Sequence, residues 1–372
     1  MQTEAAEQGE RAQARKRDEV VSLARRGLPG KAVQHAASLG LAPDTPEVEA
    51  IMRAKFVQAP PRQRESARLP APPANELTEA DVAAAIISFK RGVEPGPAGQ
   101  RPDLDRQIIG EKGDRPGCAI LAGICNLLAD GRGPPQLRPY LGGARATALA
   151  KKTKDGRDDA RPACAGEAIR RVVGKALLAT EVDVLTAHLL AHQLAVGTRA
   201  GVEAMPHLAR QWLATHSQDT NRVLINTDEA NAHNEVDRHT FLTRMREITP
   251  GLARWLEYVY PTDVPTKVFY RGKVIDSEAG GQQGCPLIGA CHAVTKRLLY
   301  ESLGLVPPLV GSAVHLPILD PPVALDMAPA FADDCLLAGP AEQVGRALEH
   351  LTQVMPRFLF FPPRAPLSHR FV

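Results

Sequence analysis

Two adjacent carboxylates, Asp333 and Asp334, stand between apolar residues near the end of the chain. The flanking segments 328–330 and 335–339 are typical of two short strands joined by a tight turn, which would place both acids at the tip of a hairpin. Asp is common in turns because its side chain bonds to nearby backbone groups, and that explanation would suffice for an isolated pair. Carboxylates in such a position are also the ligands that a hard divalent cation prefers.

A third acid, Asp228, ends the short apolar run 223–227, which we predict to be a strand. Two-metal phosphoryl transfer needs such a set, because carboxylates from separate strands must hold two cations roughly 4 Å apart. Magnesium suits hard oxygen ligands and keeps open positions for water and phosphate, and Mn²⁺ is the alternative. The sequence therefore indicates a phosphoryl-transfer site made by Asp228, Asp333 and Asp334 with two Mg²⁺ ions.

Cations are concentrated upstream of these acids. Between Gln136 and Lys175 the chain has ten Lys or Arg and four Asp or Glu, a local charge of +6 in a protein whose formal total is +3. Cationic side chains aimed at a triphosphate would stabilise its binding and the charge on the leaving group. A solvated surface would explain the same run of charge. Apolar residues at helical spacing between 169 and 177 also predict a helix whose rim carries Arg170, Arg171 and Lys175, where they would suit a nucleic-acid backbone.

In their order and spacing, these motifs resemble the reverse transcriptases of retroelements, especially the non-LTR retrotransposon type. Asp228 with Asn231-Ala232 resembles the first palm motif of that family. The segment 283–287, Gln-Gly-Cys-Pro-Leu, resembles its glutamine–glycine motif, and 331–334, Phe-Ala-Asp-Asp, resembles its aromatic-x-Asp-Asp hairpin. The segment 95–99, Pro-Gly-Pro-Ala-Gly, resembles the opening of the fingers. The resemblance covers most of the chain.

The resemblance implies an RNA-directed DNA polymerase, a nucleotidyltransferase that adds a dNTP to the 3′-hydroxyl of a DNA primer on an RNA template. Asp228, Asp333 and Asp334 would be catalytic and would bind the metal ions. Residues of the fingers and palm would bind the nucleotide: Lys151, Lys152, Arg161, His233, Gln283 and Gly284.

Within that set, the lysines and Arg161 would contact the triphosphate, and Gln283 with Gly284 would shape the pocket of the nascent base pair. The two glutamines and their glycines could equally be a turn before a helix that begins near Pro286. His233 stands where the family usually has an aromatic residue under the sugar. A lone His is as typical of a satisfied core or surface side chain.

The implied fold is α+β: the fingers and palm of a right-hand polymerase, with an antiparallel palm sheet backed by helices. Only 38 residues follow Asp334, so the resemblance implies that the chain is truncated at its C-terminus and lacks a thumb, with any partner that supplies one unknown. The sequence predicts five parts: a helical region 1–59, a Pro- and Arg-rich linker 60–75, fingers 76–220, palm 221–355 and an irregular tail 356–372.

Local patterns predict several elements of these parts. Thr78 is typical of a helix cap, and Arg271-Gly272 is typical of a hairpin turn inside 267–275. Apolar spacing predicts helices over 234–248 and after Pro340, with a further helical face around Trp255.

Composition limits the class of protein. A chain with 44% hydrophobic residues can bury a sizeable core, and six cysteines without a Cys-x-x-Cys pair favour reduced thiols in an intracellular protein, nuclear or cytoplasmic. The least polar stretch, 303–331, contains six prolines, which argues against a membrane helix and a membrane partner.

The competing hypothesis is a catalytically inactive, truncated remnant of a retroelement that at most binds nucleic acid through its basic segment.

Overall fold

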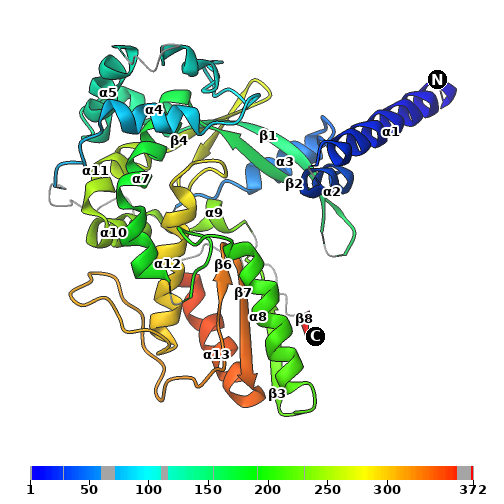
Figure 1. Ribbon diagram of the computed structural model, residues 1–372, viewed down its shortest axis with the longest axis vertical. Helices are drawn as coiled ribbons and strands as arrows, with labels where there is room; N and C mark the ends of the chain where they lie inside the picture. The colour runs from blue at the N-terminus through cyan, green and yellow to red at the C-terminus, as the bar shows by residue number, and fades with distance from the viewer. Residues whose placement is uncertain are drawn as a thin grey trace. The chain divides into compact units, whose positions relative to one another are not determined.

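The computed structural model describes residues 2–27, 29–59, 72–109, 116–153, 155–190, 192–229, 231–357 and 370–371. It is a mixed α/β structure with two small sheets of four strands each (Figure 1). Its residues form two compact units, one of 1–53 with 147–162 and the other of 54–146 with 163–372. The predicted linker lies mostly outside the described residues, which resume at 72.

The first unit is built from three helices and the outer part of a hairpin. The helices are α1 (Gln2–Arg25), α2 (Pro29–Ala37) and α3 (Pro46–Ala54). The hairpin is formed by β1 (Ala144–Lys152) and β2 (Asp158–Ala165). The segment after α2 joins the hairpin through the backbone, because Ala42 N donates to Ala148 O over 2.9 Å.

Helices supply most of the core of the second unit. They are α4 (Glu79–Ile87), α5 (Pro116–Ala129), α7 (Ala168–Leu189), α11 (Pro250–Val259) and α12 (Ile288–Ser302), with the short α6 (Arg138–Leu141). Two short 3-10 helices, Leu104–Ile108 and Pro135–Leu137, also lie in this unit. The predicted cap is confirmed, because Thr78 accepts from Asp81 N and the Asp81 carboxylate accepts from Thr78 N at 2.9 Å.

The region after Asp228 contains two helices where the sequence predicted one over 234–248. They are α9 (Ala232–Glu235) and α10 (Arg238–Ile248). The chain is extended at Val236, and Asp237 caps α10 by accepting hydrogen bonds from the amides of His239 and Thr240. A carboxylate that caps a new helix ends the previous one, because its own backbone must leave the helical conformation.

The first sheet has the strand order β2-β1-β4-β5. β4 (Thr266–Tyr270) and β5 (Lys273–Ser277) are antiparallel, and Arg271 and Gly272 between them both have positive φ, at 48° and 74°. Two consecutive left-handed residues are what a tight hairpin turn requires, so the predicted hairpin is confirmed. The first residues of β1 pair in parallel with β4.

The second sheet, with the order β6-β7-β3-β8, is antiparallel throughout. Its strands are β6 (Ala330–Phe331), β7 (Asp334–Pro340), β3 (Arg222–Thr227) and β8 (Arg370–Phe371). Within the predicted irregular tail 356–372, the backbone of residues 370–371 pairs with β3. Residues 355–357 form a 3-10 turn, and 358–369 lie outside the described residues.

Helices cover both faces of this sheet (Figure 1). Met205 and Trp212 of α8 (Gly201–His216) pack on Leu224, Leu336 and Ala338, which share one face because strand side chains alternate. On the other face Ile225 and Leu337 join the main core with α12 and α13 (Ala341–Val354). Burial on both faces fixes the register of β3 and β7, since a slip of one residue would turn every side chain over.

Candidate metal and nucleotide site

The three predicted acids lie at one end of the second sheet. Thr227 and Cys335 are the last residues paired between β3 and β7, so Asp228 and Asp334 are the next positions along these two antiparallel segments. Asp333 lies in the turn between β6 and β7, beside Ala332 with its φ of +54°. The structure thus brings together carboxylates from two segments about a hundred residues apart.

Electrostatic coupling links these carboxylates. Burial raises the pKa of Asp334, and the neighbouring Asp333 and Asp228 raise it further, against the opposing effect of the Lys296 ammonium. Asp228 and Asp334 are exposed and Asp333 is half-buried. Mutual repulsion among acids that water can reach is relieved when a cation binds between them.

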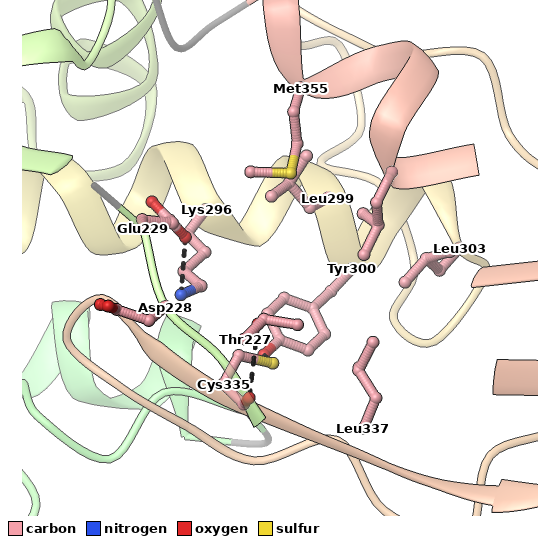
Figure 2. A pocket seen from close by; sticks show the side chains of 11 residues that line it. Thr227, Asp228, Glu229, Lys296, Leu299, Tyr300, Leu303, Cys335, Leu337 and Met355 are labelled. Atoms are coloured by element: carbon pink, nitrogen blue, oxygen red, sulfur yellow. Dashed lines mark hydrogen bonds and ion pairs between the residues drawn. The ribbon is translucent and has the colours of Figure 1, made fainter. Parts of the chain in front are cut away.

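The donor set fits a hard divalent cation in its chemistry, because all three side chains offer carboxylate oxygens. Within the described ranges, no group of three or more His, Cys, Asp and Glu side chains is already arranged to hold a metal. The exposed carboxylates of Asp228 and Asp334 would therefore have to turn toward Asp333 when a cation binds. In Figure 2 the Asp228 carboxylate points away from the apolar side chains around Tyr300.

Sequence reasoning missed a buried ionic cluster directly behind the acids. Glu229 follows Asp228, and its two carboxylate oxygens lie 2.7 Å from Lys296 Nζ and 2.8 Å from His292 Nε2. All three side chains are at least nine-tenths buried. Figure 2 shows Glu229 and Lys296 facing each other beside Asp228. Burial opposes ionisation of Glu229, but Lys296 and His292 outweigh it and lower the pKa of this carboxyl to about 2.

A largely apolar pocket lies against this cluster, and Thr227, Asp228, Glu229 and Lys296 form part of its wall. Tyr300 donates toward or accepts from Cys335 Sγ at 3.2 Å, and the remaining wall is aliphatic: Leu299, Leu303, Leu337, Leu351 and Met355 (Figure 2). Asp228 therefore borders hydrophobic residues on one side, and its side chain is exposed to water on the other.

The glutamine–glycine motif is held by contacts within the chain. Gly284 has φ of +118°, and a Cβ there would lie 2.2 Å from Cys164 O, at the end of β2. Gln283 O accepts from Cys164 N over 3.0 Å. The resemblance implies that this glycine shapes the pocket of the nascent base pair. The close approach of the Cys164 backbone and the left-handed φ are by themselves a sufficient reason for a glycine here. Gln283 is half-buried and Gly284 is exposed.

The neighbouring Gln282 is a structural residue that sequence reasoning did not separate from Gln283. It is 1% exposed, accepts from Arg170 Nη2 at 2.8 Å and donates to Thr266 Oγ1 at 3.2 Å. This amide fastens the loop to α7 and β4.

The prediction that Arg170 and Arg171 lie at a helix rim is wrong. Arg170 is 2% exposed and donates to the carbonyls of Gly142 and Gly143, and Arg171 is 6% exposed and donates to Glu94 O. Lys175 is half-buried, and its ammonium lies 4.5 Å from the centre of the Phe89 ring. The long apolar stem of an Arg side chain can lie along the buried face of a helix while its guanidinium group donates to backbone carbonyls. The number of charges in a segment does not reveal this role.

The predicted triphosphate-binding cations belong to the first compact unit. Lys151, Lys152 and Arg161 are exposed on the β1–β2 hairpin, and Lys152 Nζ lies 2.6 Å from the Asp158 carboxylate. An exposed ion pair of this kind contributes little stability, so these side chains can exchange partners at little cost.

His233 lies on α9, half-buried, with its ring centre 5.5 Å from that of His292. Burial and His292 lower the pKa of His233 to about 4, against the opposing effects of Asp333 and Glu229. The ring is therefore neutral at pH 7 and available for stacking or for a hydrogen bond.

Comparison with known proteins adds no family assignment, because no family model matches the chain and no curated protein shows significant sequence similarity to it. No helix in the described part of the chain is both long and apolar enough to cross a membrane.

Proposed function

We propose that the chain is a reverse transcriptase-like RNA-directed DNA polymerase core. It would transfer a nucleotide from a dNTP to the 3′-hydroxyl of a primer annealed to an RNA template. One observation carries this proposal: Asp228, Asp333 and Asp334 meet at the end of a single antiparallel sheet.

The arrangement of elements supports the corresponding fold assignment. The β6-β7-β3 sheet, covered by α8 on one face and by α12 and α13 on the other, would be the palm. The β1–β2 hairpin with its exposed cations would belong to the fingers.

Two Mg²⁺ or Mn²⁺ ions bound by the acids would activate the primer hydroxyl and stabilise the leaving pyrophosphate. The protein's own groups have separate tasks. Lys151, Lys152 and Arg161 would bind the triphosphate, whereas Gln283, Gly284 and the neutral ring of His233 would border the base pair and sugar. Exposure of Asp228 and Asp334 leaves them accessible to a metal–nucleotide complex.

A second candidate is an inactive chain that binds nucleic acid through its cations. It is favoured by the position of Lys296, whose ammonium lowers the pKa of Asp334 and so already supplies part of the positive charge that a metal ion would bring. This candidate predicts binding that is independent of Mg²⁺ and falls with salt.

Primer extension tests the proposal. The purified chain would be incubated with an RNA template, an annealed DNA primer, dNTPs and Mg²⁺ or Mn²⁺, beside Asp333→Asn. Asp276→Asn is the matched control, because Asp276 is an exposed aspartate on β5 that forms a surface ion pair with Lys267.

Extension by the wild type and by Asp276→Asn, with a loss of about 10³-fold in Asp333→Asn, is the expected result for removal of a metal ligand. A folded wild-type chain that extends no primer contradicts the proposal. Equal extension by all three chains would assign the activity to a contaminant.

A further inference from the structure

Lys296 lies at the junction of the two segments that carry the acids. Its Nζ is 2.7 Å from Glu229 Oε1, next to Asp228, and donates to the backbone carbonyl of Asp333 over 2.7 Å. It also reaches the carbonyl of Ala332 at 3.5 Å. One side chain on α12 thus contacts the end of β3 and the turn between β6 and β7.

The geometry of Glu229 completes this junction. Its second oxygen is bound by His292, which lies one helical turn before Lys296 on α12. His292 and Lys296, both on α12, hold the Glu229 carboxylate between them. The same contact restricts the position of the Lys296 ammonium. Side chains held from several directions have little freedom to rotate, which is the condition for precise placement of neighbouring groups.

Few side chains hold the β6–β7 turn itself, although the backbone of Ala330 in β6 also bonds to His192 O and Leu194 N. β6 has only two residues, and Ala332 has a left-handed φ that costs a non-glycine residue free energy. Gln193 supplies the other side-chain contact, accepting from Ala332 N at 2.9 Å and donating to Ala332 O at 3.2 Å. The bond from Lys296 is the one among the described contacts that reaches the carbonyl of Asp333.

We propose that Lys296, fixed by Glu229 and His292, is a positioning residue that sets the Asp333–Asp334 turn relative to Asp228. The inference rests on the proposed function for its catalytic meaning, because it concerns the same acids. We call the contacts of Lys296 with Glu229 and with the Asp333 carbonyl the Lys296 bridge. Whatever the function of the protein, this bridge determines how often the β6–β7 turn separates from the end of β3.

The test needs a variant that removes the bridge without changing net charge. Glu229→Gln/Lys296→Met does so, since one negative and one positive charge disappear together and the glutamine can still bond to His292. Replacing a buried ion pair by neutral side chains of similar size is usually tolerated, whereas removing one partner strands a buried charge.

A second buried ion pair provides the matched control. Arg244 and Glu301 lie 2.6 Å apart with exposures of 0% and 5%. Arg244 also contacts Ser312 and Glu247, and Glu301 also contacts Arg297, so none of these partners is one of the three acids. Arg244→Met/Glu301→Gln therefore reports the general effect of deleting a buried pair in the same unit. Lys296→Arg tests whether a cation of different shape restores the bridge.

The first readout is hydrogen exchange of the full chain, followed by mass spectrometry of peptides covering 330–336, with thermal unfolding measured in parallel. Glu229→Gln/Lys296→Met should exchange about tenfold faster in this segment than the wild type, by local opening. The control pair should leave exchange at 330–336 unchanged. Equal exchange in the wild type and Glu229→Gln/Lys296→Met overturns the inference, whatever the activity.

The second readout separates positioning from folding. In an active wild-type chain, the loss of the bridge should lower kcat for nucleotide addition on the order of 10²-fold and leave the KM for dNTP within about twofold, because only the acids are displaced. A KM effect alone, or an unaltered kcat with faster exchange, contradicts the role in catalysis. An inactive wild type would instead refute the proposed function, and hydrogen exchange would still decide whether Lys296 holds the turn.

Discussion

Asp228 and Asp334 stand opposite each other, one position beyond Thr227 and Cys335, the last residues paired between β3 and β7. Opposite residues of neighbouring antiparallel strands have Cα atoms roughly 5 Å apart, so the register brings the backbones of the two acids close enough for their side chains to turn toward a shared cation. That register is enforced by the apolar faces of the two strands, not by the acids. The core beneath the sheet is thus the source of the geometry of the site.

Gly284→Ala should destabilise the protein by about 1–3 kcal/mol, because the new methyl group would approach Cys164 O and the backbone is left-handed. Gly289→Ala is the matched control, since nothing lies within 4 Å of the added Cβ and the position is helical. It should be neutral or stabilising by up to about 1 kcal/mol. Urea denaturation of the three chains measures both effects, and equal stability of the two variants would refute the packing argument.

Glu235 predicts an unusual dependence of stability on pH. Burial raises the pKa of this carboxyl to about 7, although Asn231 donates to one of its oxygens. The pKa of Glu235 is higher in the folded state than in the unfolded state. At a pH between the two pKa values, the folded protein keeps the proton on Glu235 whereas the unfolded chain has lost it. The contribution of Glu235 is therefore full below the unfolded pKa of about 4.3 and is lost as pH rises to about 7.

Glu235→Gln should remove this dependence and raise the free energy of unfolding at pH 8 by about 1–3 kcal/mol, because the amide stays neutral in a buried site. Glu349→Gln, on the exposed side of α13, is the control and should change little. Denaturation curves at pH 5 and pH 8 give the comparison. A parallel pH dependence of the wild type and Glu235→Gln would contradict the assigned pKa shift.

If the β1–β2 hairpin belongs to the fingers, substitutions of different cations on it should change the KM for dNTP by different amounts. Arg161→Ala or Lys152→Ala should raise the KM for dNTP by about tenfold, the cost of one lost charge-assisted contact to phosphate. Arg157→Ala on the same hairpin removes an exposed cation that pairs with Asp155 and should alter KM by less than about twofold. Steady-state extension at varied dNTP distinguishes them, and equal effects of all three changes would point to general electrostatics.

Local sequence patterns predicted the elements that position the acids. The strand before Asp228 and the hairpin that carries Asp333 and Asp334 are present, because each depends on residues within a few positions of one another. The prediction that both acids lie at the tip is half right, since Asp333 is in the turn but Asp334 is the first residue of β7. The cap at Thr78 is also present, on α4. The break between α9 and α10 was missed, since the capping role of Asp237 competes with a continuous apolar pattern.

Long-range partners were beyond the reach of the sequence. Glu229 and Lys296 are 67 positions apart, and a charged residue gives no sign in the sequence of which distant charge will neutralise it. Arg170 was assigned to the surface by its charge, whereas the carbonyls of Gly142 and Gly143 satisfy it in the core. A Lys and a His one turn apart on the apolar helix α12 were the available signal of a buried cluster.

The central claim is that acids from two segments form one cation site. Binding of Mn²⁺ to the full chain, followed by electron paramagnetic resonance, tests it in the wild type, Asp228→Asn, Asp334→Asn and the double variant. A shared site predicts that each substitution weakens binding about tenfold or more and that the double variant is little worse than either one, because the same site is already lost. Binding that is unaffected by both substitutions, or independent additive losses, would contradict a site shared by Asp228 and Asp334.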